Sequence, residues 1–450
     1  MIDSAHNAKL PPRGSAVHVV GVAGVGMNAI AQVLQARGYR VSGSDRLKDQ
    51  GGSSPLLDRL ENQGIALHPQ DGSAIGAETD AVIISSAIEP DNPEWIAARA
   101  FHVPVLHRAE ALAAVIGSQR CVAIAGTSGK TTITGMAGWL LTELGMEPNV
   151  VNGGPILNWK SRDGVGNVRM TTSDTWVIEV DESDRSLLCF HPEYAIISNI
   201  TRDHFPLEET VDLFATFMKQ VRHTLVLGPG VTEHLNEVRN SSVRWVEAPA
   251  PAEWTTALPL PGRHNRENAQ LAVTLCEVLG FDREEAMRAL TRFKGIERRL
   301  ECVGEGGGLA VYDDYAHNPA KIHAAWTAVA DNAASVHAVW RPHGYGPLAA
   351  MADDLVAMFC DTCRENDRLY VLPVYYAGGT TEKALTSEAF VGQLIAAGVP
   401  AEYMPDYDAL AKRLDKNVSR GSAILCMGAR DPDLPVFARR VSKDLIDANA

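Results

Sequence analysis

The amino-acid sequence predicts an α/β protein with three domains, each built on a sheet of parallel strands that is covered by helices. The length of 450 residues corresponds to about three domains at roughly 150 residues each. Short apolar segments alternate with segments of helical periodicity, which is typical of parallel sheets. The alternation restarts near Ser118 and again after Arg299. We therefore expect domains over residues 1–117, 118–299 and 300–450.

Composition and charge exclude several classes of protein. The chain is 46% hydrophobic and 21% charged, as expected of a globular protein. Its 41 Lys and Arg and 55 Asp and Glu give a net charge of −14, which disfavours binding to nucleic acids and anionic membranes. With no signal-peptide core and no apolar run of spanning length, we expect a cytoplasmic protein. Seven scattered cysteines predict reduced thiols.

The first domain begins with a glycine-rich loop between a strand and a helix. Strands are predicted over residues 16–20, 40–42 and 81–85, and helices over residues 27–37 and 56–62. Without side chains, the loop glycines let backbone N–H groups approach a phosphate at the N-terminus of the helix. The loop therefore predicts an anion site at Gly21, Gly24 and Gly26.

The ligand of this loop is not fixed by its spacing. The glycines read GxxGxG, whereas the dinucleotide fingerprint is GxGxxG, so the signal for a nicotinamide cofactor is weak. Asp45 follows the next strand at about the distance expected of a ribose-binding acid. We favour a nucleotide-linked pyrophosphate, and a tight turn without a ligand is the alternative.

A second glycine loop opens the middle domain. It lies between a predicted strand over residues 121–125 and a helix from about Lys130, and it reads Gly126, Thr127, Ser128, Gly129, Lys130, Thr131, Thr132. This pattern predicts ATP binding, with Lys130 on the phosphates and the hydroxyl of Thr131 or Thr132 on Mg²⁺. The strict P-loop has a further glycine where Ile124 stands, so we expect a variant loop. A turn without a nucleotide is the alternative.

Acidic and imidazole side chains follow two further strands of this domain, predicted over residues 175–180 and 194–198. The first strand runs into an acidic segment, Glu179 to Asp184, and the second is followed by Asp203 and His204. Clustered carboxylates repel one another unless a cation lies among them, which predicts a metal site. The alternative is a solvated acidic turn and a loop histidine.

The last part of the chain returns to the α/β pattern after a predicted helix over residues 265–279. Strands are predicted over residues 309–312, 336–340, 368–372 and 423–427.

Ten segments in this order resemble the Mur ligases, which build the peptide stem of the bacterial cell wall. They read GVAGVGM with SGSD, SSAIEPDNPE, VPVLHRAEAL, AGTSGKTT, EVDESD, SNITRDH, PGRHNRENA, FKGIERRLE, DDYAHNP and MGARD. The resemblance implies an N-terminal Rossmann-like domain for the UDP-linked substrate, a central P-loop-type ATPase domain and a C-terminal Rossmann-like domain for the acceptor. It also implies a ligase that joins the carboxylate of UDP-N-acetylmuramate to L-alanine or a related amine through an acyl phosphate, with ATP and Mg²⁺.

The resemblance also implies roles for individual residues. It places the UDP-linked substrate at Gly21, Gly24, Gly26, Met27, Asp45, Ser85, Ser86 and Ala87. It places ATP at residues 126–132, at His264, Asn265 and Asn268, and at Arg299 and Asp314. The magnesium ligands are Thr131, Glu179 and His204, and the catalytic residues are Lys130, His204 and His317. Lys219 stands near a carbamylated lysine of some relatives, with a solvent-facing lysine as the alternative.

Four positions depart from the alanine-adding members of the family. Asn318 replaces the second of two adjacent histidines, and Ser128 replaces a histidine of the phosphate loop. Gly344 and Gly346 stand where arginines can meet the carboxylate of the acceptor. The sequence therefore leaves a different amino acid or a peptide open as the acceptor, and also, as other functions, an NAD(P)-binding oxidoreductase or an idle nucleotide-binding protein.

Overall fold

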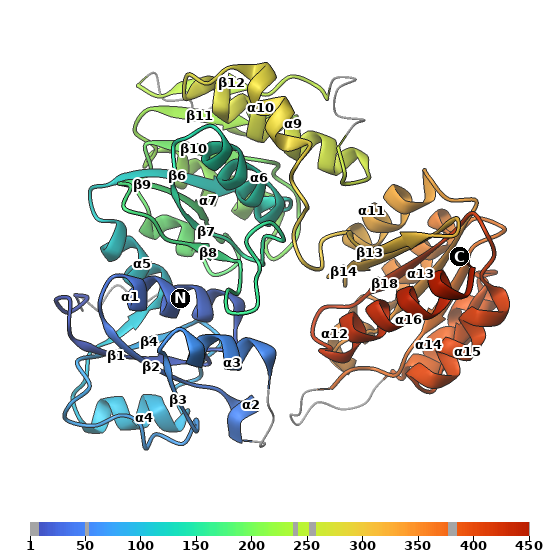
Figure 1. Cartoon of the computed structure of the whole chain (residues 1–450), viewed down its shortest axis with the longest axis horizontal. Helices are drawn as coiled ribbons and strands as arrows, with labels where there is room; N and C mark the ends of the chain where they lie inside the picture. The colour runs from blue at the N-terminus through green and yellow to red at the C-terminus, as the bar shows by residue number, and fades with distance from the viewer. Residues whose placement is uncertain (1–8, 50–53, 237–241, 252–257, 377–384, 450) are drawn as a thin grey trace. The chain divides into compact units, whose positions relative to one another are not determined.

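The computed structural model describes residues 9–49, 54–236, 242–251, 258–376 and 385–449, and it confirms an α/β protein with three sheets (Figure 1). The chain forms two compact units. The first comprises residues 1–259 and 267–295 and holds two sheets, and the second comprises residues 260–266 and 296–450 and holds one. The domain boundaries at residues 117 and 299 stay a prediction. In the described part of the chain, we find no helix that is long and apolar enough to cross a membrane.

The N-terminal sheet has five parallel strands in the order β3-β2-β1-β4-β5. The strands are β1 (Ala16–Val20), β2 (Arg40–Ser44), β3 (Ala66–His68), β4 (Ala81–Ile84) and β5 (Val105–His107). The helices are α1 (Val25–Ala36), α2 (Arg46–Asp49), α3 (Pro55–Asn62), α4 (Pro93–Ala100) and α5 (Arg108–Ile116). Because strand side chains alternate between faces, Val17 and Val19 pack in one core while Val20 packs in another with Ala98 of α4.

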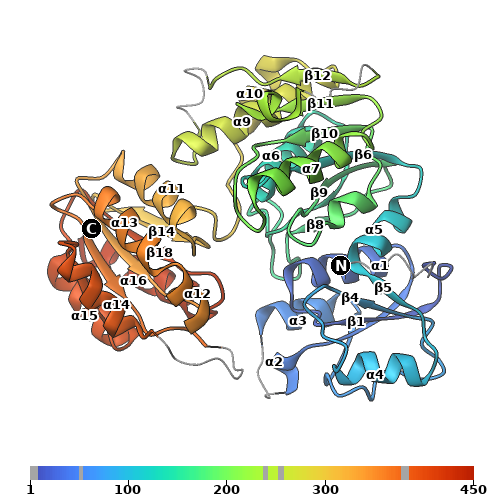
Figure 2. The same cartoon turned by 180° about the vertical axis from the view of Figure 1, so that it is seen from behind.

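The central sheet has seven strands in the order β12-β11-β10-β6-β9-β7-β8, and only the β7–β8 pair is antiparallel. The strands are β6 (Arg120–Ala125), β7 (Asn149–Val151), β8 (Val168–Arg169), β9 (Thr175–Glu179), β10 (Tyr194–Ile197), β11 (Thr224–Leu227) and β12 (Arg244–Glu247). The helices are α6 (Lys130–Glu143), η1 (Ser186–Cys189), α7 (Leu207–Met218), α8 (Val231–Leu235), α9 (Arg263–Val278) and α10 (Arg283–Leu290). Helices α6 and α7 cover opposite faces of this sheet, as the front and back views show (Figure 2).

The sheet of the second unit has six strands in the order β13-β14-β18-β15-β16-β17, with only β13 antiparallel to its neighbour. The strands are β13 (Glu301–Gly306), β14 (Leu309–Asp314), β15 (Ser335–Trp340), β16 (Arg368–Val371), β17 (Ala401–Tyr403) and β18 (Ser422–Met427). The helices are α11 (Pro319–Ala330), α12 (Tyr345–Ala350), α13 (Ala352–Thr362), α14 (Ser387–Ala396), α15 (Tyr407–Asn417) and α16 (Asp433–Asn449).

A chain of buried polar groups ties α4 to the N-terminal sheet. Glu94 lies 3.0 Å from His18 Nε2 and accepts a hydrogen bond from Ser44, while His18 Nδ1 lies 2.8 Å from Ser42 Oγ. His18, Ser44 and Glu94 are each 0% exposed. Buried polar groups lower the free energy of the fold only while each has its partner, so this network makes α4 depend on β1 and β2.

We predict that Glu94→Ala destabilises the protein by roughly 2–5 kcal/mol, because His18 and Ser44 lose their buried partner. Differential scanning calorimetry measures the effect as a lower midpoint temperature of the first unfolding transition. The matched control is Glu61→Ala. Glu61 Oε1 lies 2.9 Å from Lys48 Nζ, and the Lys48 side chain is 39% exposed, so the loss of this ion pair costs less than about 1 kcal/mol. Equal shifts for the two variants would contradict the prediction.

Candidate functional site

Three loops meet at one edge of the central sheet because β6 lies between β9 and β10. Parallel strands end at the same edge, so the phosphate loop after β6, the acidic segment after β9 and the loop after β10 become neighbours. Backbone hydrogen bonds connect them directly: Val180 N donates to Ile124 O at 3.0 Å, and Ser198 N donates to Ala125 O at 3.0 Å. The sequence-predicted strands thus deliver the predicted ATP and metal segments to one place.

The phosphate loop has a shape that only glycine permits. Gly126 has a φ of +131°, and a Cβ at this position would overlap the side chain of Ser198. Ser128 N donates to Asn199 Oδ1 at 3.0 Å, so the loop after β10 supports the phosphate loop from the side. A Cβ on Gly129, which directly precedes α6, would lie 2.5 Å from Asn268 Oδ1. The structure therefore brings Asn268, a predicted adenine-side residue, against the phosphate loop.

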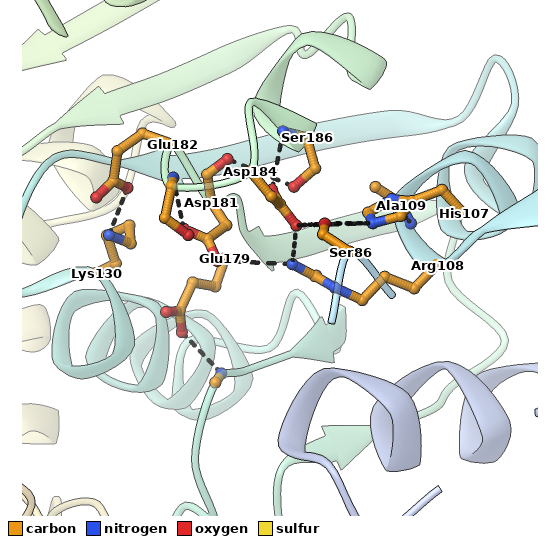
Figure 3. Close-up of polar contacts among 12 residues, drawn as sticks. Ser86, His107, Arg108, Ala109, Lys130, Glu179, Asp181, Glu182, Asp184 and Ser186 are labelled. Atoms are coloured by element: carbon orange, nitrogen blue, oxygen red, sulfur yellow. Dashed lines mark hydrogen bonds and ion pairs between the residues drawn. The ribbon is translucent and has the colours of Figure 1, made fainter. Parts of the chain in front are cut away.

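Lys130 is held in a buried ion pair. Its Nζ lies 2.6 Å from Glu182 Oε2 and donates to Gly126 O at 2.9 Å, and the two charged side chains are only 13% and 3% exposed (Figure 3). Burial lowers the pKa of Lys130, but the charges of Glu182 and Asp181 outweigh it, so the pKa of Lys130 is raised. Burial, together with the charge of Asp181, raises the pKa of Glu182 despite the opposing effect of Lys130. Glu182 Oε1 is buried without a hydrogen-bond partner among the described residues.

Glu179 lies beside the start of α6. Its Oε1 accepts a hydrogen bond from Thr131 Oγ1 at 3.0 Å, and its Oε2 accepts one from Gly153 N at 2.7 Å. Two of the three predicted magnesium residues, Thr131 and Glu179, are therefore in contact. Thr132, the other candidate hydroxyl, is buried in α6 at 7% exposure.

The third predicted magnesium residue stands apart from this pair. The side chain of His204 is 50% exposed, and its charged neighbour is Asp203, at 3.9 Å. Within the described ranges, no group of three or more His, Cys, Asp or Glu side chains is arranged to hold a metal ion. Lys219 follows the last residue of α7 and is exposed, which agrees with the solvent-facing alternative.

The glycine loop of the N-terminal domain is closed by Asp45. Asp45 Oδ2 accepts a hydrogen bond from Ala23 N at 2.9 Å, which ties the end of β2 to this loop. Of the predicted substrate residues, Ser86 and Ala87 are exposed and Ser85 is half-buried after β4. Met27 is 4% exposed within the hydrophobic core, so its side chain packs and is not available to a ligand.

Sequence reasoning gave no role to His107 and Arg108 and placed Asp184 only in the acidic segment of the metal site, whereas these residues join the N-terminal and central domains. Arg108 Nη2 donates to Asp184 Oδ2 at 2.8 Å, and Ser86 Oγ donates to the same oxygen at 3.2 Å (Figure 3). Burial alone would raise the pKa of Asp184. The charge of Arg108 and a hydrogen bond from Ser186 act in the opposite direction, and the net result is a lowered pKa. Burial lowers the pKa of His107. A signal was present, since His107 and Arg108 follow β5 at the edge where the glycine loop lies.

In the second unit, two predicted residues make local contacts around β14. Asp314 accepts hydrogen bonds from Leu300 N and Ala316 N, both at 2.7 Å, and burial raises its pKa. This carboxylate therefore connects the backbone before β13 to the backbone after β14. Arg299 lies with its guanidinium carbon 5.5 Å from the ring centre of Tyr315.

The predicted adenine-side residues His264 and Asn265 lie at the beginning of α9. Asn265 is 3% exposed and donates from Nδ2 to Pro261 O at 2.8 Å. A Cβ on Gly262 would lie 3.0 Å from the ring of His264. Both contacts are made within the second unit.

His317 lies in an aromatic niche after β14. Its ring centre is 5.8 Å from that of Tyr315 and 5.2 Å from that of His343. His317 Nδ1 lies 3.0 Å from Tyr315 O, so with Nδ1 protonated the lone pair of Nε2 is left available. Asn318 caps α11 by accepting from Lys321 N at 3.0 Å, which gives the departure from a second histidine a structural role.

Three family domains match the chain in order. Residues 16–120 match the domain described as Mur ligase family, catalytic domain, residues 124–223 the Mur ligase middle domain, and residues 298–430 the domain described as Mur ligase, glutamate ligase domain.

Curated relatives match over nearly the whole length. The UDP-N-acetylmuramate–L-alanine ligase of Chelativorans sp. (strain BNC1) is 32% identical over 462 residues, covering 94% of this chain and 96% of that relative. The ligase of the same name from Thermobifida fusca (strain YX) is 34% identical over 458 residues, covering 92% and 94%. The crystal structure of UDP-N-acetylmuramate–alanine ligase from Thermotoga maritima has a TM-score of 0.76 at 23% identity, covering 97% of this chain and 100% of that chain. This likeness supports the three-domain fold.

We predict that His317 is neutral throughout the neutral pH range. Burial lowers the pKa of its imidazole from 6.5 to about 4. The unfolded chain therefore binds a proton more readily, and His317 reduces the stability of the fold as the pH falls from about 6.5 to about 4. A ¹⁵N nuclear magnetic resonance titration measures the pKa directly, with His317→Gln as the variant that assigns the signal. A midpoint near 6.5 would refute the prediction.

Proposed function

Because the chain belongs to the Mur ligase family, we propose that it joins the carboxylate of UDP-N-acetylmuramate to L-alanine in peptidoglycan synthesis, with consumption of ATP. The observation that carries the proposal is the arrangement around Lys130, where a glycine loop of phosphate-binding shape faces an acidic segment. The matches to ligase domains in all three parts of the chain leave the oxidoreductase alternative without support.

ATP is needed because a carboxylate is a poor acyl donor. Its charge repels nucleophiles, and oxide is a poor leaving group. Phosphoryl transfer from ATP converts the carboxylate into an acyl phosphate, which the amine then attacks with loss of phosphate. The chain must therefore hold two anions in line and offset their repulsion. Lys130 supports this role, since its charge is maintained in a buried site at the start of α6.

The residues around Thr131 fit a magnesium ion by their chemistry. The Thr131 hydroxyl and the Glu179 carboxylate are hard oxygen ligands, and they already lie 3.0 Å apart. His204 joins this set only if its exposed side chain turns toward them. When bound, the ion supplies positive charge against the phosphate oxygens of ATP. Glu179 also accepts from Gly153 N, and this contact fixes its carboxylate for that purpose.

The acceptor side of the reaction is assigned to the C-terminal domain. With a pKa lowered to about 4, His317 is neutral, so it can orient the amine by accepting a hydrogen bond from it or take the proton that the amine loses as it attacks the acyl phosphate. Gly344 directly precedes α12 and has a φ of +76°, a conformation that an arginine rarely adopts. The acceptor carboxylate is therefore held without a guanidinium at this position. A different amino acid or a short peptide is the alternative acceptor, and an assay of phosphate release with each amine distinguishes these acceptors.

We predict that the purified chain releases phosphate only when ATP, Mg²⁺, UDP-N-acetylmuramate and an amine are all present. A coupled phosphate assay over amino acids and short peptides, with mass spectrometry of the product, identifies the acceptor. Stimulation by L-alanine supports the proposed reaction, and stimulation by another amine alone moves the chain to the alternative. If no pair of acid and amine stimulates phosphate release, the assignment as a ligase is wrong.

We predict that Lys130→Ala lowers kcat about 100-fold to 1,000-fold, because a stabilising charge at the transferring phosphoryl group is lost, roughly 2.7–4 kcal/mol of barrier. The coupled phosphate assay measures kcat. The matched control is Lys412→Ala, an exposed lysine of α15, which leaves kcat unchanged. A Lys130→Ala enzyme with full turnover and an unchanged melting temperature would contradict the role of Lys130.

A further inference from the structure

The side chain of Arg108 packs against the glycine loop of the N-terminal domain. Arg108 is the first residue of α5, directly after β5, and its side chain packs against Gly26. A Cβ on Gly26 would lie 3.2 Å from Cδ, 3.3 Å from Nε and 3.4 Å from Nη1 of Arg108. The side chain of Arg108 is only 24% exposed. A positive charge is thus fixed at a loop whose exposed backbone suits an anion.

Only part of this guanidinium is used within the protein. Nη2 donates to Asp184 Oδ2 at 2.8 Å and lies 3.6 Å from Asp181 Oδ2. Neither Nε nor Nη1 donates a hydrogen bond to any residue that the structure describes. Partly buried donors without acceptors lower the stability of a site unless a ligand supplies the acceptor, and a guanidinium matches the oxygens of phosphate and carboxylate groups.

We propose that Arg108 binds an oxyanion of the sugar nucleotide at the loop that contains Gly26, and that Asp184 of the central domain positions its guanidinium for this contact. The inference rests on the proposed function and adds a substrate-binding residue and a positioning residue to it. The oxyanion is the pyrophosphate or the lactyl carboxylate of UDP-N-acetylmuramate, which share the chemistry that an arginine recognises.

The position of Asp184 gives the contact a second consequence. Asp184 belongs to the same segment as Glu179 and Glu182, and Glu182 contacts Lys130 (Figure 3). Glu179 contacts Thr131. Ser86, from the predicted substrate segment, donates to the oxygen of Asp184 that Arg108 binds. The acidic segment therefore contacts the sugar-nucleotide side through Asp184 and the phosphate loop through its two glutamates. Arg108 is held by a residue of the domain that contains Lys130.

Isothermal titration calorimetry of UDP-N-acetylmuramate into the full-length chain tests the proposal. We predict that Arg108→Ala raises Kd about 10-fold to 100-fold, because hydrogen bonds from a charged donor are lost. Arg108→Lys keeps the charge without the planar fork and recovers part of the affinity. Asp184→Asn raises Kd by a smaller factor, because the guanidinium loses its positioning partner. Arg99→Ala, at an exposed arginine of α4, is the control and leaves Kd unchanged.

Two further titrations separate the possible outcomes. With UDP as the ligand, weaker binding by Arg108→Ala assigns the contact to the pyrophosphate, and unchanged binding assigns it to the lactyl carboxylate. A non-hydrolysable ATP analogue binds all variants alike, which shows that they are folded. If the wild-type chain binds UDP-N-acetylmuramate and Arg108→Ala binds it equally well, the proposal is wrong. If the wild-type chain does not bind it, the proposed function itself fails.

Discussion

The arrangement of the candidate ATP site depends on β6 pairing with β9 on one side and β10 on the other. This pairing places the ends of three parallel strands next to one another, so segments more than 70 residues apart in sequence share hydrogen bonds, as Thr127 and Thr201 do. The position of each loop in this site depends on the register of the paired strands. A shift of one residue in β6 would turn its buried side chains to the other face and would move Gly126 away from Ser198.

Charge compensation is the second constraint on this edge. The acidic segment holds four carboxylates, at residues 179, 181, 182 and 184, and they are matched by two cations from different elements. Lys130 at the start of α6 forms an ion pair with Glu182, and Arg108 at the start of α5 forms ion pairs with Asp184 and Asp181. Because the two cations come from different domains of the first unit, these three carboxylates have their cationic partners only when both domains are folded against the segment.

Local patterns predicted the fold better than the geometry of the site. The alternation of apolar and helical segments gave correct strands at residues 16–20 and 121–125 within a residue, because buried parallel strands are continuous apolar runs. It missed β13, an antiparallel edge strand with two glycines among its six residues, since such a strand lacks that pattern. The first strand and its glycine loop could therefore be predicted from the sequence, whereas the edge strand β13 of the last sheet could not.

Site residues were predictable where the backbone alone places them. Gly126 and Gly129 have positive φ angles that a glycine pattern reveals, whereas His204 and Arg108 depend on side-chain direction and on a contact between domains. Asn318 shows the same limit, because its role as a helix cap follows from its backbone position and not from the family motif.

The pairing of Lys130 with Glu182 also has a consequence for selectivity. An anion that approaches Lys130 has to displace a carboxylate that already lies 2.6 Å away in a largely buried site. A singly charged anion such as chloride offers Lys130 less negative charge in exchange for that carboxylate than a polyphosphate does. The Lys130–Glu182 pair therefore sets a cost of displacement that multiply charged anions offset more readily than small monovalent ones.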